Sequence, residues 1–323
     1  MKAIVQDNYG EAGVLRLEDI DKPVPGASEV LIRVRAAGVE QGVWHLMTGL
    51  PYLARAAGSG LSRPKDRVRG REVAGQVEAV GPDVTQFRPG DEVFGTCGGS
   101  FAEFACARED KLALKPANLS FEQAAAVPIS GVTALQGLRD SGNVQPGQKV
   151  LVIGAGGGVG SFAVQLAKAF GAEVTGLCSA GKADLVRSLG AGDVIDYTRE
   201  DVVDGARRYD LILDTAGNRP LSKLRRALTP RGTLVIVGGE GGGRWLGGFD
   251  RALRAPLLSL FVSQKLRGLI SLERQADLRV LAELIEAGKV VPAIGKVFPL
   301  GEAPDAIRYM RGGGAHGKVV VTV

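Results

Sequence analysis

Closely spaced glycines follow an apolar run in residues 150–168, VLVIGAGGGVGSFAVQLAK, and a helix-like pattern begins directly after them. The spacing fits A-x-G-x-x-G from Ala155 or G-x-x-G-x-x-G from Gly154, whereas Val159 breaks the strict G-x-G-x-x-G form. At a strand-to-helix turn, unpaired helical N–H groups and the helix dipole can hold a pyrophosphate if no side chain blocks its approach. The pattern therefore predicts a dinucleotide site, and the alternative is tight strand–helix packing without a ligand. The residues predicted to contact the dinucleotide here are Ala155, Gly157, Gly158, Val159 and Gly160.

The end of the next expected strand decides which dinucleotide is preferred. NAD sites usually place a carboxylate on the ribose 2′-hydroxyl, about 20 residues after the glycines. Here residues 177–182 read Leu-Cys-Ser-Ala-Gly-Lys, so a hydroxyl at Ser179 and an ammonium at Lys182 stand in that region. Because both groups suit a 2′-phosphate, we expect NADPH in preference to NADH. The same lysine would also fit an ordinary solvated helix start.

The secondary-structure elements expected to position these residues follow two kinds of sequence pattern. Before residue 120, alternating runs such as 29–36 and 75–80 are separated by turn signals, which predicts an antiparallel, barrel-like β region. After it, apolar strands alternate with helical patterns, which predicts a parallel, doubly wound sheet. The glycine-rich tract 238–248 is expected to be a mobile loop. The expected strands are 149–153, 173–177, 193–195, 210–213, 233–237 and 318–323, and the expected helices are 158–170, 183–189, 219–228, 273–287 and 303–310.

Composition limits the class of protein. The chain has 323 residues, 45% hydrophobic and 23% charged, which suits a globular protein of about two domains. Its 40 Lys and Arg against 35 Asp and Glu leave a formal charge of +5, and the cations are scattered, so we expect no nucleic-acid partner. The first residues lack the apolar segment of a signal peptide, and the most apolar run, 255–262, is too short to span a membrane. We expect a cytoplasmic protein with no membrane partner.

Three segments in order resemble one known family. They are 70–95, GREVAGQVEAVGPDVTQFRPGDEVFG, then 124–138, AAAVPISGVTALQGL, and the glycine turn. Together they resemble the medium-chain dehydrogenase/reductase superfamily along nearly the whole chain. Within it the chain is most similar to the zinc-free quinone oxidoreductase and zeta-crystallin branch, including the subgroup with a GLPYLxR segment, here residues 49–55.

The resemblance implies an α/β fold with two domains. A GroES-like β-barrel substrate domain would comprise residues 1–123 and the return segment 268–323, and a Rossmann domain with a doubly wound parallel sheet would comprise 124–267. It also implies a cleft for the nicotinamide, and a homodimer formed through edge strands of the Rossmann sheets, with that strand expected within 257–270. Around the adenosine 2′-phosphate the resemblance places Ser179, Lys182 and Tyr197, and near the nicotinamide it places Thr133, Gly238 and Gly239.

The zinc-ligand positions of the superfamily carry other residue types in this chain. Zinc-dependent relatives have Cys after a Gly-Val step, His in Gly-His-Glu, and often Cys before Gly-Val-Thr. Here those positions hold Glu40, Arg71, and Ile129 or Ser130. Because a guanidinium and an aliphatic side chain offer no lone pair to zinc, we expect no metal. We hypothesise that an ion pair between Glu40 and Arg71 replaces it, and the alternative is that each points to solvent independently.

The cysteines and histidines of the chain are not spaced in the sequence as metal ligands usually are. Cys97, Cys106 and Cys178 form no CxxC pair, so we expect buried small hydrophobes. His45 and His316 form no i, i+4 pair and are expected to be surface or core histidines.

The expected reaction follows from the resemblance and from the missing zinc ligands. A quinone or an enone delocalises an incoming charge in its conjugated system, whereas a simple ketone needs an electrophile. We therefore expect hydride transfer from NADPH to a quinone or another α,β-unsaturated carbonyl as the electron acceptor. The Asn-Pro-x-Asp motif of many relatives is absent after the Gly-Val step, so no catalytic residue is assigned. The substrate-pocket residues expected are Glu40, Trp44, Tyr52 and Arg71, of which the two aromatic residues would equally fit a packing role.

Two other functions stay open at this point. An enoyl reductase acting on thioester-linked enones would use the same hydride step. A non-catalytic NADPH-binding protein with a structural or RNA-binding role would fit the changed pocket and the sequence pI of about 9.1. The aromatic and basic interleaving of an RNA module is not visible in the sequence.

Overall fold

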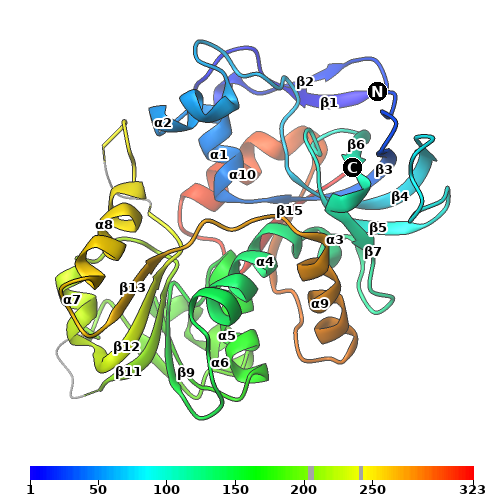
Figure 1. Cartoon of the computed structure of the whole chain (residues 1–323). Coiled ribbons are helices and arrows are strands. Elements are labelled where there is room, and N and C mark those ends of the chain that lie inside the picture. The colour runs from blue at the N-terminus through cyan, green and yellow to red at the C-terminus, as the bar shows by residue number, and fades with distance from the viewer. Residues whose placement is uncertain (203–206, 240–242) are drawn as a thin grey trace. The chain divides into compact units, whose positions relative to one another are not determined.

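The computed structural model describes residues 1–202, 207–239 and 243–323 (Figure 1). The chain divides into two compact units. The first comprises Met1–Val132, Glu273–Gly288 and Pro292–Val323, and the second comprises Thr133–Leu272 and Lys289–Val291. Residues 124–132, expected in the Rossmann domain, belong to the first unit, whereas residues 268–272 and 289–291, expected in the substrate domain, belong to the second unit.

Local contacts explain both shifts of boundary. Helix α3 (Phe121–Ala125) packs against strands of the first unit, which keeps the residues after 123 in that unit. At the other boundary, the N–H of Leu269 donates to the carbonyl of Ile236 at 2.8 Å, and the N–H of Leu272 donates to the side chain of Gln136 at 3.0 Å. These bonds hold residues 268–272 to the second unit.

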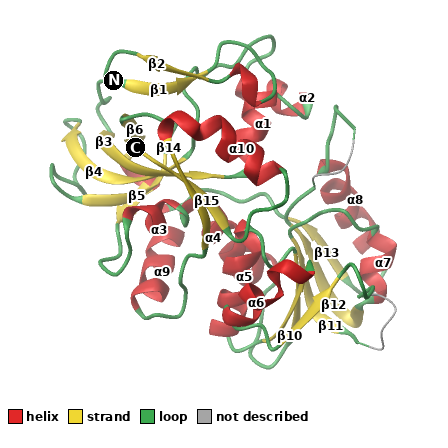
Figure 2. Cartoon of the chain, turned by 180° about the vertical axis from the view of Figure 1, so that it is seen from behind, coloured by secondary structure: helices red, strands yellow, loops and turns green. Residues whose placement is uncertain are grey.

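The second unit contains a six-stranded sheet in the order β10-β9-β8-β11-β12-β13, in which all neighbours are parallel. In Figures 1 and 2 α5 and α6 cover one face of this sheet, and α7 and α8 cover the other. The doubly wound parallel sheet is thus confirmed. Its strands are β8 (Lys149–Ile153), β9 (Glu173–Cys178), β10 (Asp193–Asp196), β11 (Tyr209–Asp214), β12 (Leu228–Ile236) and β13 (Lys265–Gly268). Its helices are α5 (Gly158–Ala169), α6 (Ala183–Ser188), α7 (Leu221–Arg226) and α8 (Phe249–Ser259), and α4 (Pro128–Gln136) crosses from the first unit.

The first unit is mainly antiparallel. Its larger sheet runs β14-β15-β3-β4-β5-β7, with β6 also paired to β3 and only β14 and β15 parallel to each other, and β1 and β2 form a separate pair. Its strands are β1 (Lys2–Val5), β2 (Arg16–Asp19), β3 (Glu29–Val39), β4 (Glu72–Val80), β5 (Glu92–Thr96), β6 (Phe104–Arg108), β7 (Leu112–Leu114), β14 (Ile294–Pro299) and β15 (Lys318–Thr322). Its helices are α1 (Gln41–Thr48), α2 (Tyr52–Ala54), α3, α9 (Gln275–Glu286) and α10 (Ala303–Arg311).

Apolar periodicity explains where each core forms. In α5 every residue from 160 to 167 is buried, because this helix packs against the sheet close to its glycine turn. On the other face Leu224 of α7 and Ala255 of α8 join a core cluster with alternate residues of the strands, such as Ile212 and Leu234. The fold class, α/β with one β-rich and one parallel-sheet unit, is the one that the sequence predicts.

Two expected segments differ in the structure. The helix expected to reach residue 228 ends at Arg226, because Leu228 already pairs with Tyr209 as the first residue of β12. Of the segment 257–270, only Lys265–Gly268 forms the edge strand, and residues 257–259 continue α8. The mobile loop expected over 238–248 falls partly on residues 240–242, which lie outside the described residues. Across the described ranges, none of the helices is both long and apolar enough to span a bilayer.

Candidate functional site

The carboxyl ends of the parallel strands form one edge of the second unit's sheet. β8, β11 and β12 are neighbours, and they end at Ile153, Asp214 and Ile236. The strand order reverses at β8, because β9 and β10 lie on one side of it and β11 to β13 on the other. Open α/β sheets bind their ligands at such a switch point, outside the carboxyl ends of the strands.

The glycine turn lies at this switch point, between β8 and α5. Gly154 has a φ of +80°, and a Cβ there would lie 2.5 Å from Oγ1 of Thr215. A Cβ on Gly160 would lie 2.1 Å from the carbonyl oxygen of Gly154, so only glycine lets the helix approach the strand this closely. Gly157 is the N-cap of α5 and brings no side chain to cap it. The first N–H groups of α5 therefore suit an anion.

The residues predicted to contact the dinucleotide differ in how far they are buried in this turn. Ala155 and Gly160 are buried, whereas Gly157, Gly158 and Val159 are partly exposed at the start of the helix.

The loops that follow β11 and β12 also pack glycine backbone closely together. Gly217 has a φ of +67°, and a Cβ there would lie 2.3 Å from the carbonyl oxygen of Gly238. A Cβ on Gly239 would lie 2.4 Å from the Cα of Gly248. The expected residues Gly238 and Gly239 thus lie against the loop that follows β11. Thr133, the other residue expected near the nicotinamide, lies in α4 with 8% of its surface exposed.

A buried carboxylate that sequence reasoning missed fixes the loop after β11. Asp214 is fully buried and accepts hydrogen bonds from the N–H of Gly217 at 3.0 Å and from Nη2 of Arg251 at 2.8 Å. Because the cation compensates the buried charge, the carboxylate can hold Gly217 in its left-handed conformation. A single acidic residue ending the apolar strand YDLILD was the available signal.

The residues expected at the 2′-phosphate lie close together after β9 and β10. Ser179 follows β9 and is the N-cap of a 3₁₀ turn, Ala180–Lys182. The N–H of Lys182 donates to the carbonyl of Ser179 at 2.9 Å, and the N–H of Tyr197 donates to that of Cys178 at 3.1 Å. Burial lowers the pKa of Lys182, and the nearby Cys178 opposes this shift. A hydroxyl, an ammonium and a phenol, the last 52% exposed, therefore share one edge of the sheet.

The carboxylate nearest along this edge belongs to β10, and it is engaged by its own loop. Asp196 pairs in register with Cys178, and its Oδ1 accepts the N–H and hydroxyl of Thr198 at 3.0 Å and 2.9 Å. The N–H of Thr198, ahead of its hydroxyl and Arg199, lowers the pKa of Asp196 against the opposing effect of burial. The residue directly after β9 is Ser179, which is not a carboxylate.

In the first unit, Arg71 lies between two carboxylates. Nη1 of Arg71 is 3.6 Å from Oε1 of Glu40, and its Nη2 donates a hydrogen bond to Glu273. Glu273 also accepts the hydroxyl of Thr96 at 3.1 Å. The proximity of Glu40 and Arg71 expected from the sequence is confirmed, but 3.6 Å exceeds a hydrogen bond, and the hydrogen-bonding partner is Glu273. Burial alone would lower the pKa of Arg71, but Glu40 and Glu273 outweigh it and raise that pKa.

Glu40 is placed by the junction of β3 and α1. It is the N-cap of α1, and its side chain accepts the N–H of Gly42. Only 9% of the Glu40 side chain is exposed, against 33% for Arg71. The cap therefore fixes the carboxylate in a partly buried place, where an adjacent cation is needed.

A second ion pair lies completely inside the first unit. Nζ of Lys318 in β15 contacts Glu72 in β4 and donates to the hydroxyl of Ser130 at 3.2 Å, while Glu72 accepts the N–H of Ile129 at 2.8 Å. Burial raises the pKa of Glu72, although Lys318 opposes this. A Cβ on Gly38 would lie 2.1 Å from Glu72, so a glycine is required beside the pair. Ser130, one of the two residues compared with the third zinc ligand, thus accepts a hydrogen bond from Lys318.

The two expected aromatic residues have partners in the structure. The guanidinium of Arg311 lies 3.9 Å from the ring centroid of Trp44, which packs against the core of the first unit. The guanidinium of Arg55 lies 4.9 Å from the ring of Tyr52, and its Nε donates to the carbonyl of Gly49 at 2.8 Å. Arg55 thereby caps the last turn of α1, which gives the GLPYLxR segment a structural role.

The cysteines differ from the expectation that all three are buried, because Cys178 is buried whereas Cys97 and Cys106 are only partly buried. The two histidines lie in different surroundings. Nδ1 of His45 lies 2.7 Å from the carbonyl oxygen of Leu50, and His316 is exposed. Among residues 1–202, 207–239 and 243–323, no group of three or more His, Cys, Asp or Glu side chains is arranged to hold a metal ion.

Comparison with known proteins places this architecture in a family. Residues 26–117 match the alcohol dehydrogenase GroES-like domain, and residues 189–321 match the zinc-binding dehydrogenase family. A quinone oxidoreductase of Pseudomonas aeruginosa is 35% identical, with 92% of each chain covered. A 2-methylene-furan-3-one reductase of Solanum lycopersicum is 34% identical over 99% of this chain and 79% of its own length. The Escherichia coli quinone oxidoreductase solved with NADPH superposes with a TM-score of 0.85 at 25% identity, covering 100% of both chains.

These matches extend over both units and agree with the strand order and the glycine turn described above. They also agree with a nicotinamide cofactor and with an oxidoreductase activity. The chain therefore belongs to the medium-chain dehydrogenase/reductase superfamily and is one of its quinone oxidoreductase-like members.

Proposed function

We propose that the protein is an NADPH-dependent oxidoreductase that reduces quinones or other α,β-unsaturated carbonyls without zinc. The observation that carries the proposal is the glycine turn at the switch point, followed at the end of β9 by Ser179 and Lys182 in place of a carboxylate. The similarity to a quinone oxidoreductase and to a 2-methylene-furan-3-one reductase supports this class of acceptor.

The chemistry of the carboxyl edge fits NADPH. The turn after β8 has no room for side chains at Gly154 and Gly160, and its helix start can receive a pyrophosphate. Lys182 and Ser179 can donate to a 2′-phosphate, with Tyr197 beside them. The backbone at Gly238 and Gly239, together with Thr133, would lie along the nicotinamide. When bound, NADPH supplies a hydride, and these residues bind and orient it.

The donor set of the first unit supports a reaction without zinc. Arg71 is a cation with no lone pair, and its charge is shared between Glu40 and Glu273. We assign Glu40 and Arg71 to the substrate pocket, where the one-third exposed guanidinium can donate to a carbonyl oxygen. The contacts of Trp44 with Arg311 and of Tyr52 with Arg55 favour the packing role for these two rings.

The edge of the parallel sheet supports a homodimer. β13 is the last strand in the sheet order, and large apolar side chains before it are exposed, including Leu257 at 63%, Leu260 at 77% and Phe261 at 85%. An unpaired edge beside an apolar surface is typical of an interface between copies of a chain. A cytoplasmic location is part of the same proposal.

An acceptor panel tests the function. NADPH oxidation is followed by absorbance with a benzoquinone, a naphthoquinone, an alkyl enone, an enoyl thioester and a simple aldehyde. NADH replaces NADPH in one series, and EDTA is added in another. We expect turnover of a quinone or an enone that prefers NADPH and survives EDTA. Turnover of the thioester alone would identify an enoyl reductase, and tight NADPH binding without any turnover would favour the binding-protein alternative.

A further inference from the structure

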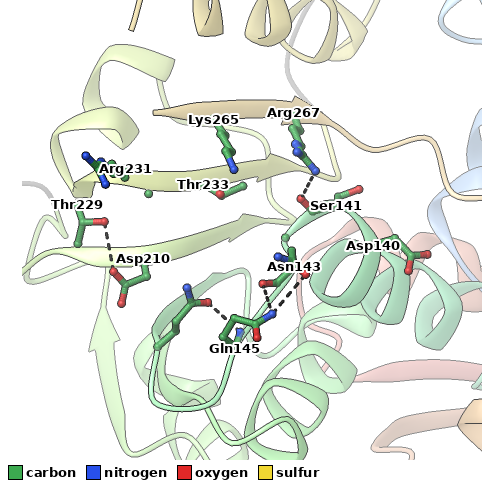
Figure 3. A pocket seen from close by; sticks show the side chains of 13 residues that line it. Asp140, Ser141, Asn143, Gln145, Asp210, Thr229, Arg231, Thr233, Lys265 and Arg267 are labelled. Carbon is green, nitrogen blue, oxygen red and sulfur yellow. Dashed lines mark hydrogen bonds between the residues drawn. The ribbon is translucent and has the colours of Figure 1, made fainter. Parts of the chain in front are cut away.

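A polar pocket lies at the opposite edge of the parallel sheet from the glycine turn. Its volume is about 490 Å³, within the usual range for small-molecule sites. Figure 3 shows it between the starts of β11, β12 and β13 and the segment that leads into β8. The lining residues come from the amino ends of the strands, so the pocket is separate from the dinucleotide edge. They are Asp140, Ser141, Gly142, Asn143, Gln145, Gln148, Asp210, Thr229, Arg231, Gly232, Thr233, Lys265 and Arg267.

Three cations line one side of this pocket. Arg231 comes from the start of β12, and Lys265 and Arg267 come from β13. Lys265 and Arg267 are two residues apart on one strand, so their side chains leave the same face about 7 Å apart. Figure 3 shows both extending from β13 toward the same side. Long side chains with this spacing can direct their charged ends at one anion.

The cations have no carboxylate of their own. In the ranges that the structure describes, Arg231, Lys265 and Arg267 form no ion pair, and Arg267 donates to the carbonyl oxygen of Ser141 at 2.9 Å. The pocket's acidic residues are engaged elsewhere. Asp140 pairs with the adjacent Arg139.

Asp210 is held by the backbone and by a hydroxyl. It accepts the N–H of Lys149 at 3.0 Å and the hydroxyl of Thr229 at 3.3 Å. Both of these donors are neutral, so the charge of Asp210 stays in the pocket and offsets only part of the charge of the three cations. The side formed by β12 and β13 therefore has an excess of positive charge.

The opposite wall offers amide groups in a fixed arrangement. Asn143 adopts a φ of +47°, which is uncommon for a residue with a side chain. Nε2 of Gln145 donates to the backbone carbonyl of Asn143 at 3.0 Å and to its side-chain oxygen at 3.3 Å. Gln148 closes the same loop by accepting the N–H of Gln145 at 3.0 Å. These bonds occupy Nε2 of Gln145 and leave Nδ2 of Asn143 and Oε1 of Gln145, on two residues that line the pocket, available to bind hydroxyls.

We propose that this pocket is a second binding site, for a phosphorylated, hydroxyl-rich small molecule. Arg231, Lys265 and Arg267 would bind the phosphate, because arginine and lysine suit a dianion with several acceptor oxygens. The side-chain amides of Asn143 and Gln145 and the remaining lone pairs of the Asp210 carboxylate would bind the hydroxyls. The site does not depend on the acceptor of the reductase, so its test is separate from the test of catalysis.

The test measures binding by calorimetry with NADPH present in excess, so that the dinucleotide site is filled. The probes are glucose 6-phosphate, inorganic phosphate and glucose, at physiological ionic strength. We expect glucose 6-phosphate to bind best and glucose least. Loss of all binding in the presence of NADPH would overturn the proposal, and equal binding of both phosphate probes would overturn the role of the amides.

A charge-matched pair of variants locates the site. Arg231→Gln/Lys265→Gln should weaken glucose 6-phosphate binding at least about tenfold, because two charge-assisted hydrogen bonds are lost. Arg63→Gln/Lys289→Gln removes two exposed cations that do not line the pocket and should change nothing. NADPH affinity should stay the same in both variants, which also reports that they fold. Equal loss in both pairs would show a non-specific charge effect and overturn the proposal.

Discussion

The contact between Glu40 and Arg71 makes a quantitative prediction about stability. At 3.6 Å, two unit charges attract by about 1 kcal/mol in water and about 5 kcal/mol at the effective dielectric constant of a protein. Glu40 is 9% exposed and Arg71 is 33% exposed, and Glu273 shares the guanidinium, so the coupling lies between these limits. We expect a coupling free energy of about 2 kcal/mol.

A double-mutant cycle measures this coupling. The variants are Glu40→Gln, Arg71→Gln and the double variant, each unfolded by urea. The chain has two tryptophans, Trp44 and Trp245, and only Trp44 belongs to the first unit. In a Trp245→Phe background, fluorescence therefore follows the unit that contains the pair. Arg71→Gln alone should cost about 3 kcal/mol, because it leaves a buried carboxylate without its cation, and adding Glu40→Gln should restore part of that loss.

A coupling below about 0.5 kcal/mol would show that the two side chains are energetically independent and would contradict a stabilising ion pair. The control is the pair Arg33 and Glu78 in the same unit, whose charged atoms are 3.0 Å apart but more exposed on the arginine side. It should couple less than the buried pair despite the shorter distance. Equal coupling in both pairs would show that burial is not what strengthens the contact.

Three further predictions concern the second unit and the cysteines. Lys182→Ala should weaken NADPH binding about tenfold or more and leave NADH binding unchanged, as measured by fluorescence titration, and an equal loss for both would contradict a 2′-phosphate contact. Gly160→Ala should lower both NADPH affinity and stability, because its Cβ would lie 2.1 Å from the carbonyl oxygen of Gly154, whereas Gly192→Ala, with its nearest atom at 3.8 Å, serves as the control. Burial raises the pKa of Cys97 from 9.0 to about 12. The thiolate fraction of Cys97 at pH 8 therefore falls from about one in ten to about one in ten thousand. Mass spectrometry should find that iodoacetamide alkylates Cys97 roughly a thousandfold more slowly in the folded protein than in urea. The rate in the folded protein should rise with pH. Similar rates in both states would contradict the raised pKa of this thiol.

Local sequence patterns are sufficient to predict the parts of the site that are formed by a single continuous segment. The turn from Gly154 to Gly160 is specified by residues close in sequence, since its glycines contact one another and the adjoining strand. The same holds for Ser179 and Lys182, which belong to a single short turn. Short continuous apolar runs also predict the central strands of the parallel sheet, because strands such as β8 and β11 are buried on both faces.

Contacts between distant segments could not be predicted in the same way. Glu273, the hydrogen-bonding partner of Arg71, lies 202 residues away in the sequence and outside any motif. The resemblance drew attention to Glu40 and Arg71 because two ligand positions meet at one metal, but it carried no information about a third charged residue. The end of α8 was missed for a related reason. Its apolar residues fit a strand equally well by composition, and only the packing of Ala255 on the sheet favours the helix.

The buried pair of Glu72 and Lys318 has a consequence for how the chain reaches its folded state. The two residues are 246 positions apart, and β15 lies between the edge strand β14 and β3 in the first unit's sheet. During synthesis, β3 and β4 leave the ribosome long before Lys318 exists, so the nascent sheet has an open edge at β3 and an acidic side chain without its counter-ion. The second unit, whose strands are contiguous in sequence, can fold in that interval. Completion of the first unit must therefore wait for β15, whose Lys318 supplies the counter-ion of Glu72.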